Sequence, residues 1–331
     1  MNYRPKIHCV IPHYNDSTAW YRSTAPIIAL KHHGIDFVMK QSVDWVDMLY
    51  TDIVFLQRPF KNDFKDIVEY ARNCNKPIWI DFDDDLNSVP DYNPHRHVFK
   101  DGIDKENFQL MISMANVVTV TTDYLRDKYK EFNNNIIVIP NAHNDYMFPF
   151  EYNFSKNKIV NWRGTNTHRE DLRSVIETLR KVQQLESSKY WLFNFIGQDS
   201  DLMKGLVKSR QVKPMELIEY FRYIKSLNPM IQLCPLVVND FNLAKSNISW
   251  IEGTYSGAVT IAPMNFHEFR KPGIFTYGSQ ESLYYTFEAF FQMTETELEK
   301  MYNESFEEIK SNLLLSHVNK QRAEIVQKLL N

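Results

Sequence analysis

Compact apolar runs recur through the first half of the chain, and the segments between them repeat apolar residues every three or four positions. The runs predict buried strands, and the longer period predicts amphipathic helices. The expected strands are residues 6–12, 35–39, 52–56, 76–82, 116–120 and 136–139, and the expected helices are residues 17–33 (interrupted or started near Pro26), 62–72, 105–115 and 122–132. Strands that alternate with helices indicate a parallel α/β sheet.

The same alternation starts again after residues 142–157, a stretch without a clear period. The second set of expected strands is residues 158–162, 190–196, 231–236 and 258–262, and the expected helices include residues 167–185, 214–227 and 294–330. We therefore predict an α/β protein of two Rossmann-like parallel-sheet domains, residues 1–145 and 146–331, which face each other across a cleft. Ligands of open parallel sheets bind at the carboxyl ends of the strands, so the cleft is the expected site.

The composition limits the possible function classes. The length of 331 residues agrees with two domains, and the net charge of −3 does not indicate a generally basic nucleic-acid-binding surface, although it permits a local basic patch. The three cysteines are widely spaced beside apolar sequence, which is typical of reduced, buried thiols. Because no apolar run approaches the roughly 20 residues of a membrane span and no signal peptide opens the chain, we expect a soluble cytoplasmic protein.

Several catalytic motifs are absent from the sequence. It contains no nucleophile elbow, no Walker loop, no G-x-G-x-x-G and no H-E-x-x-H. Hydrolase, nucleotide-hydrolysing, dehydrogenase and zinc-protease functions therefore have no motif support.

The most informative stretch is residues 239–263, in which polar residues precede a short helix, a glycine turn and an apolar strand. The polar residues are Asn242, Lys245, Ser246 and Asn247. A helix N-terminus carries unpaired N–H groups and partial positive charge, so with Lys245 beside it this stretch predicts a phosphate-binding site. Glu252 lies about two helical turns beyond Lys245, and both could face one cleft. The alternative is an ordinary amphipathic helix that leads into a strand.

A second candidate phosphate site follows the first strand of the second half, at Arg163, Gly164, Thr165 and His168. Glycine allows close approach to the backbone, threonine can cap the next helix, and arginine makes paired hydrogen bonds to phosphate. His168 could donate to an anion or cap the turn. The alternative is a capped turn with a surface arginine.

An acidic run, Asp81, Asp83, Asp84 and Asp85, stands where a parallel strand should open onto the cleft. Adjacent carboxylates repel one another, so such a cluster is costly unless it binds metal, hydroxyls or basic groups. One interpretation is a metal-binding Asp-x-Asp, and another is acceptor binding or a general base for a sugar-accepting hydroxyl. The remaining interpretation is a solvated acidic loop that caps a helix.

Aromatic and basic residues are interleaved in two further places. Tyr21 and Arg22 lie early in the first helix, and a basic cluster after the acidic run consists of His95, Arg96, His97 and Lys100. Such mixtures suit a sugar, a nucleobase or a nucleic-acid backbone. More often they are only loops.

Together these motifs resemble those of two-domain (GT-B) glycosyltransferases of the broad group-1 type, in particular their divergent bacteriophage and bacterial relatives. The resemblance covers nearly the whole chain. In the first half it consists of Tyr21-Arg22 with Pro26, Asp83-Asp84-Asp85-Leu86 with Pro90 and Asn93-Pro94, and Ile139-Pro140-Asn141. In the second half it consists of Arg163-Gly164-Thr165 with His168 and Asp171-Leu172, and Phe241-Asn242 with Lys245-Ser246-Asn247, Trp250, Glu252 and Gly257.

The resemblance implies an enzyme that moves a sugar from a nucleotide-sugar, expected to be UDP-linked, to an acceptor hydroxyl. Carried over from the family, Arg163 and Lys245 bind the donor diphosphate and Glu252 binds the ribose hydroxyls. The other expected donor-binding residues are Gly164, Thr165, His168, Asn242, Ser246 and Asn247. The expected catalytic residues are Asp83, Asp84, Arg163 and Lys245. Charge stabilisation of the departing nucleoside diphosphate is the expected main catalytic effect, without a metal or a further cofactor.

The first half would then bind the acceptor. The expected acceptor-binding residues are Tyr21, Arg22, Asp85, His95, Arg96 and His97. Phage relatives include enzymes that glycosylate hydroxymethylated pyrimidines in DNA, so a 5-hydroxymethylated pyrimidine is one expected acceptor. A cell-surface glycan or small glycoside is the alternative acceptor, and a non-catalytic sugar- or nucleotide-binding module is the alternative function.

Two positions depart from the family pattern. Ala244 stands where a glutamate is frequent, eight positions before the ribose-binding glutamate, and His168 stands where a lysine is common, five positions after the arginine.

Overall fold

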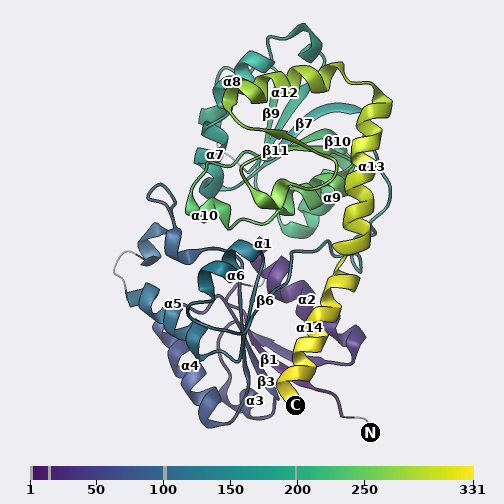
Figure 1. The fold of residues 1–331 in the computed structure, drawn as a ribbon. Coiled ribbons are helices and arrows are strands. Elements are labelled where there is room, and N and C mark those ends of the chain that lie inside the picture. The colour runs from purple at the N-terminus through teal and green to yellow at the C-terminus, as the bar shows by residue number, and fades with distance from the viewer. Residues whose placement is uncertain (1–2, 14–15, 100–102, 198–199) are drawn as a thin grey trace.

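The computed structural model describes residues 3–13, 16–99, 103–197 and 200–331, and these residues form two domains, each built on a six-stranded parallel sheet (Figure 1). The predicted fold class is thereby confirmed. Long apolar runs form the central strands because both faces of a parallel sheet are covered by helices.

The first sheet has the strand order β2-β1-β3-β4-β5-β6. Its strands are β1 (Lys6–Val10), β2 (Asp36–Lys40), β3 (Ile53–Gln57), β4 (Ile78–Phe82), β5 (Val117–Val120) and β6 (Ile136–Val138). Its helices are α1 (Ser17–Ala19), α2 (Ala25–Ala29), α3 (Trp45–Leu49), α4 (Asn62–Asn73), α5 (Ile103–Met114) and α6 (Asp123–Tyr129). A π-helical turn, Trp20–Thr24, joins α1 to α2 just before Pro26, which confirms the predicted interruption. Proline has no N–H to bond the carbonyl one turn earlier, so the helical ladder changes there.

The second sheet has the order β12-β11-β10-β7-β8-β9. Its strands are β7 (Asn157–Arg163), β8 (Leu192–Ile196), β9 (Ser209–Val212), β10 (Pro229–Leu233), β11 (Val259–Pro263) and β12 (Ile274–Tyr277). The helices that follow are α7 (Arg169–Arg173), α8 (Ile176–Val182), α9 (Leu217–Leu227), α10 (Asp240–Leu243), α11 (Ile248–Ser256), α12 (Gln280–Gln292), α13 (Glu295–Asn312) and α14 (Leu315–Leu330). The direction of winding reverses between β7 and β10, which makes their carboxyl ends a topological switch point.

Several predicted boundaries were wrong. The helix expected over residues 167–185 is split into a 3-10 turn (Asn166–His168), α7 and α8, and the expected single helix 294–330 breaks after α13. The edge strands β9 and β12 and the helices α3 and α12 had no predicted counterpart. Cys9 and Cys234 are buried as expected, whereas Cys74 is only half-buried.

The last helix, α14, leaves the second domain and packs on the first. Leu315, Val318 and Val326 share a core with Ile7 and Ile27. Figure 1 shows α13 and α14 running in succession along one side of both domains. The sequence prediction assigned all of residues 146–331 to the second domain. That assignment was wrong for α14, because its apolar face is buried against α2 and β3 of the first.

The two domains share part of their apolar core. Phe148, in the crossover between them, stacks on Phe221 of α9 with 4.6 Å between ring centroids, and Trp20 of the first domain approaches both rings. Among the described helices, none is both long and apolar enough to cross a membrane.

Candidate functional site

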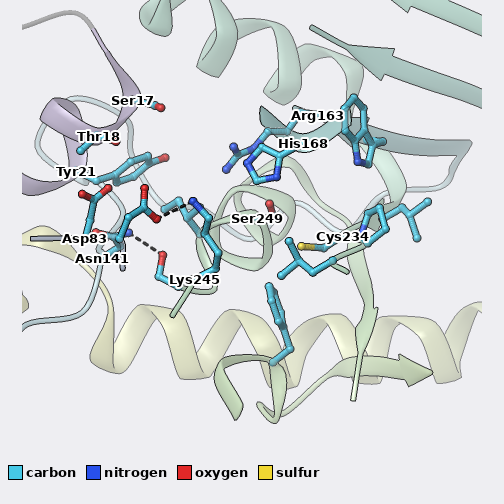
Figure 2. A pocket seen from close by; sticks show the side chains of 18 of the residues that line it. Ser17, Thr18, Tyr21, Asp83, Asn141, Arg163, His168, Cys234, Lys245 and Ser249 are labelled. Atoms are coloured by element: carbon cyan, nitrogen blue, oxygen red, sulfur yellow. Dashed lines mark hydrogen bonds and ion pairs between the residues drawn. The ribbon is translucent and has the colours of Figure 1, made fainter. Parts of the chain in front are cut away.

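A pocket of about 840 Å³, which includes space open to solvent, lies between the two domains (Figure 2). The first domain contributes Ser17, Thr18, Tyr21, Arg22, Asp83, Asp84 and Asn141. The second contributes Trp162, Arg163, His168, Leu233, Cys234, Pro235, Leu236, Lys245, Ser246, Ile248, Ser249 and Phe269. The pocket therefore opens at the switch point between β7 and β10, where the topology predicts ligand binding.

The turn after β7 is shaped by glycine. A Cβ on Gly164 would overlap the Trp162 ring and approach the His168 Cβ at 2.9 Å, so this position has no space for a side chain. The Gly164 N–H donates to the Ile196 carbonyl, which holds the turn against β8. Thr165 is exposed and its hydroxyl pairs with that of Thr167 at 2.9 Å. The turn thus places Arg163 and His168 in the pocket and leaves Thr165 outside its lining.

Arg163 is held by a buried carboxylate. Its Nε donates to Glu252 Oε2 at 2.7 Å, and the same carboxylate accepts from Tyr220 at 2.8 Å and, across the domain boundary, from Tyr21 at 2.7 Å. Burial acts to lower the pKa of Arg163, but Glu252 outweighs it and raises that pKa. Glu252 is 5% exposed and is not among the residues that line the pocket, and in this structure its carboxylate anchors Arg163.

Lys245 is held by an acidic group of the other domain. Its Nζ donates to Asp84 Oδ1 at 2.6 Å, and Arg58, the residue after β3, pairs with Asp84 and with Asp83. Figure 2 shows the Lys245–Asp84 bond as a dashed line beside the first-domain residues Tyr21 and Asp83. The acidic run therefore meets basic groups, which is what its charge density requires.

The two aspartates of this cluster have opposite protonation behaviour. Burial raises the pKa of Asp83 to about 6, although Arg58 opposes the shift. Burial would also raise the pKa of Asp84, but Lys245 and Arg58 lower it to about 2. Asp84 is therefore a stable anion, whereas Asp83 can gain and lose a proton near neutral pH.

The start of α11 forms part of the pocket wall. Ser246 accepts from the Asn141 side chain at 2.8 Å, which is a further hydrogen bond between the domains. Asn247 is buried and donates to the Glu268 carbonyl, so it stabilises the loop without lining the pocket. Just before α11, Asp240–Leu243, which were predicted as loop, form the short helix α10.

His168 is oriented by Asp171, a buried carboxylate of α7. The two side chains lie 2.9 Å apart through His168 Nδ1, and Asn242 donates to the other carboxylate oxygen at 2.9 Å. Asn242 also donates to the Val237 carbonyl and is 3% exposed. It was predicted to contact the donor, but the structure places it behind the pocket wall.

Two predicted acceptor-binding residues, Arg22 and Asp85, form ion pairs within the first domain. Arg22 lines the pocket floor, where it pairs with Asp81 through two hydrogen bonds of 2.9 and 2.8 Å and donates to the Ile139 carbonyl. Asp85 is fully buried, accepts from the Asn87 N–H and pairs with Lys128 at 2.5 Å. The prediction that Asp85 contacts the acceptor is not supported, because its charge is neutralised away from the pocket.

The basic cluster of residues 95–97 is exposed and lies outside the pocket lining. His97 Nδ1 contacts the Pro94 carbonyl at 2.8 Å, Arg96 pairs with Asp91, and the His95 backbone N–H donates to Asn93. Lys100 lies outside the described residues. The loop is tied to the second domain by Asn239, which donates to the Tyr92 hydroxyl at 2.8 Å.

The described part of the chain contains no preformed cluster of metal-binding side chains. Among those residues, no group of three or more His, Cys, Asp or Glu side chains is arranged to hold an ion. The Asp-x-Asp interpretation also meets a geometric obstacle, since Asp81, Asp83 and Asp85 each already pair with a basic residue.

Sequence reasoning missed several residues of the site. Arg58 directly follows a strand, so the rule that ligands meet strand ends could have indicated it. Ser17 and Thr18 lie at the start of α1, after the loop that follows β1. Tyr220 carries no such signal, because its role depends on contacts with segments distant in sequence. Asp171 belongs to the family resemblance, which assigned it no role.

The three-dimensional comparison identifies the fold. No protein-family model matches the sequence, and no curated protein matches it either. A glycosyltransferase from Rickettsia africae ESF-5 superimposes with a TM-score of 0.68 at 14% identity, covering 99% of each chain. Anabaena Alr3699/HepE in complex with UDP-glucose gives 0.67 at 10% identity, over 98% of this chain and 100% of that one. The chain has the GT-B fold.

A third GT-B structure of this kind is an alpha-glucosyltransferase in complex with UDP and a 13-mer DNA containing a HMU base. It gives a TM-score of 0.68 at 9% identity over 98% of this chain and 100% of that one. At such low identities the likeness establishes the fold shared with these proteins.

Proposed function

We propose that the protein is a glycosyltransferase that moves a sugar from a nucleotide-sugar to an acceptor hydroxyl. The observation that carries the proposal is the pocket at the switch point of the second sheet, where Arg163, His168 and Lys245 face Asp83 and Asp84 of the first domain. Cations on one wall suit a diphosphate, and carboxylates on the other suit hydroxyl groups.

The second domain is the proposed donor side. Arg163 uses Nε to bind Glu252, and its terminal guanidinium nitrogens are the groups that would bind phosphate oxygens. The N-terminus of α11 adds partial positive charge beside Lys245. Positioned cations stabilise the negative charge that grows on a departing nucleoside diphosphate, and this is the proposed main catalytic effect. UDP is the first nucleotide to test, because two of the similar folds are described in complex with UDP or UDP-glucose.

The first domain is the proposed acceptor side. Ser17, Thr18 and Tyr21 place hydroxyl groups at the pocket, and Asp83 provides the carboxylate best suited to exchange a proton with an acceptor hydroxyl. Asp84 is held as an anion by Lys245 and Arg58, so it is the weaker candidate for a base.

Two acceptor classes follow from different observations. A 5-hydroxymethylated pyrimidine in DNA is favoured by the fold shared with the alpha-glucosyltransferase described with HMU DNA, and by the exposed residues His95, Arg96 and His97. A neutral glycan is favoured by the charge of the first domain, because acidic residues outnumber basic ones in residues 1–145. A polyanion would bind such a domain only through a local basic face.

The test is transfer with the purified protein. Duplexes that contain hydroxymethylcytosine or hydroxymethyluracil, and a panel of glycans, are incubated with UDP-sugars and other nucleotide-sugars, and both nucleoside diphosphate release and acceptor mass are measured. A gain of one hexose or related sugar on one acceptor class supports the proposal and identifies the acceptor. Tight UDP binding without turnover on any acceptor would overturn it in favour of a non-catalytic binding module.

A further inference from the structure

We propose that Asp171 is a positioning residue that holds His168 as a third cation for the donor diphosphate, beside Arg163 and Lys245. The inference rests on the proposed function, and it assigns to this chain a His–Asp pair as part of the phosphate site. His168 would contact the ligand, whereas Asp171 would act through His168.

Asp171 is placed to hold more than one wall of the pocket. Its carboxylate is 2% exposed and accepts three hydrogen bonds, from His168 Nδ1 at 2.9 Å, from the Val237 N–H at 2.8 Å and from Asn242 Nδ2 at 2.9 Å. These donors come from the turn after β7, the loop after β10 and the short helix α10. A buried carboxylate with this number of donors is fixed in place, so it fixes the imidazole as well.

The direction of the His168 ring follows from this contact. Because Nδ1 faces Asp171, the other ring nitrogen, Nε2, lies on the opposite edge of the ring. His168 is 27% exposed and lines the pocket, and Figure 2 shows its ring with the Arg163 side chain on the second-domain side. When both nitrogens carry protons, Nδ1 donates to Asp171 and Nε2 donates toward the pocket.

The same arrangement occurs twice at this site. Glu252 is buried, accepts from two tyrosine hydroxyls and from the Arg163 Nε, and Arg163 lines the pocket. Asp171 is buried, is held by Val237 and Asn242 and takes the His168 Nδ1. In both cases an anchored carboxylate lies behind a cation of the second domain. Asp84 differs, because it approaches Lys245 from the opposite domain, through the space that the ligand would enter.

The decisive experiment measures UDP binding by calorimetry for the full chain and for three variants. His168→Gln should bind UDP at least tenfold more weakly, and His168→Lys should stay within about threefold of the wild type, because lysine restores a cation at the same place. Asp171→Asn should weaken binding as His168→Gln does and shift the ¹⁵N resonances of the His168 ring. Glu177→Gln is the matched control, since Glu177 forms an exposed pair with Arg180, also three residues apart, on the outer helix α8.

The outcomes separate the two proposals. If the wild type binds UDP and His168→Gln binds it equally well, the inference is wrong and the proposed function stands. If His168→Lys is as weak as His168→Gln, the imidazole acts as a base or by shape, and the cation role is refuted. If the wild type binds no nucleoside diphosphate, the proposed function itself fails. Should Asp171→Asn not fold, the His168 pair still decides, because that side chain is partly exposed.

Discussion

The Lys245–Asp84 bond leads to a prediction that runs against the usual effect of mutating a site. If Lys245 binds the donor diphosphate, the ligand must replace Asp84 as its partner. Asp84 is then a competitor built into the first domain, and Asp84→Asn should increase the affinity for UDP. An asparagine keeps the shape of the side chain but removes the charge that holds Lys245.

The size of the effect can be estimated from the geometry. The Nζ–Oδ1 distance is 2.6 Å, and the two side chains are only 20% and 13% exposed, so the pair is weakly screened. A charged hydrogen bond of this kind contributes about 1.5–3 kcal/mol. The lowering of the Asp84 pKa to about 2, against the effect of burial, agrees with an attraction of that order. At roughly 1.4 kcal/mol per factor of ten, UDP affinity should rise about ten- to a hundredfold.

Calorimetry with UDP at low ionic strength measures this change directly. Asp123→Asn is the control, because Asp123 is an exposed acidic residue whose partner is Arg126 and whose loss removes one negative charge without touching Lys245. Thermal unfolding of each variant checks that the fold is kept. UDP affinity that is equal or lower in Asp84→Asn would show that Asp84 and the ligand do not compete for Lys245.

Three further predictions concern the same site and its support. Arg163→Ala and Lys245→Ala should each weaken UDP binding by about 1.5–3 kcal/mol, and unchanged affinity in calorimetry would remove that residue from the site. Asp83→Asn should reduce transfer and spare UDP binding. The pKa of Asp83 is raised to about 6, so its carboxylate is protonated as the pH falls. Wild-type kcat/KM should therefore decline below about pH 6. A flat pH profile would contradict a role of Asp83 as the base. Gly257→Ala should lower the free energy of unfolding by about 1–3 kcal/mol, measured by denaturant unfolding. The φ of Gly257 is 103°, which disfavours other residues, and a Cβ there would overlap Asn153 and Asn228. Unchanged stability would be inconsistent with this geometry.

The central strands could be predicted from sequence because burial on both faces produces continuous apolar runs. Runs such as residues 52–56 and 76–82 became β3 and β4 with shifts of only one or two residues. The edge strand β9 was missed because it is half-exposed and reads Ser-Arg-Gln-Val, which has no apolar run. Helix ends were less predictable, since the break after Asn312 depends on α14 finding a partner in the other domain.

The candidate site was predictable by region and less so by residue. A strand end with its glycine turn located Arg163 and His168, and a helix N-terminus located Lys245; the structure brings all three into one pocket. The same reasoning selected Asn242 and Asp85, but their polar groups form buried hydrogen bonds and ion pairs with other residues of the protein. Sequence position does not distinguish a polar side chain that faces a ligand from one that supports its neighbour. The pairing of Lys245 with Asp84 was also beyond sequence reasoning, because it joins two separately folded sheets.

The return of α14 to the first domain bears on how this protein can be divided. The chain passes between the domains twice, once through residues 142–156 and once from α13 into α14. A fragment that stops at residue 145 would leave uncovered the apolar surface around Ile7 and Ile27. Supplying residues 315–330 as a separate peptide should restore its solubility. Exchange of the first domain between proteins of this architecture would likewise require that the transferred domain bring its own terminal helix.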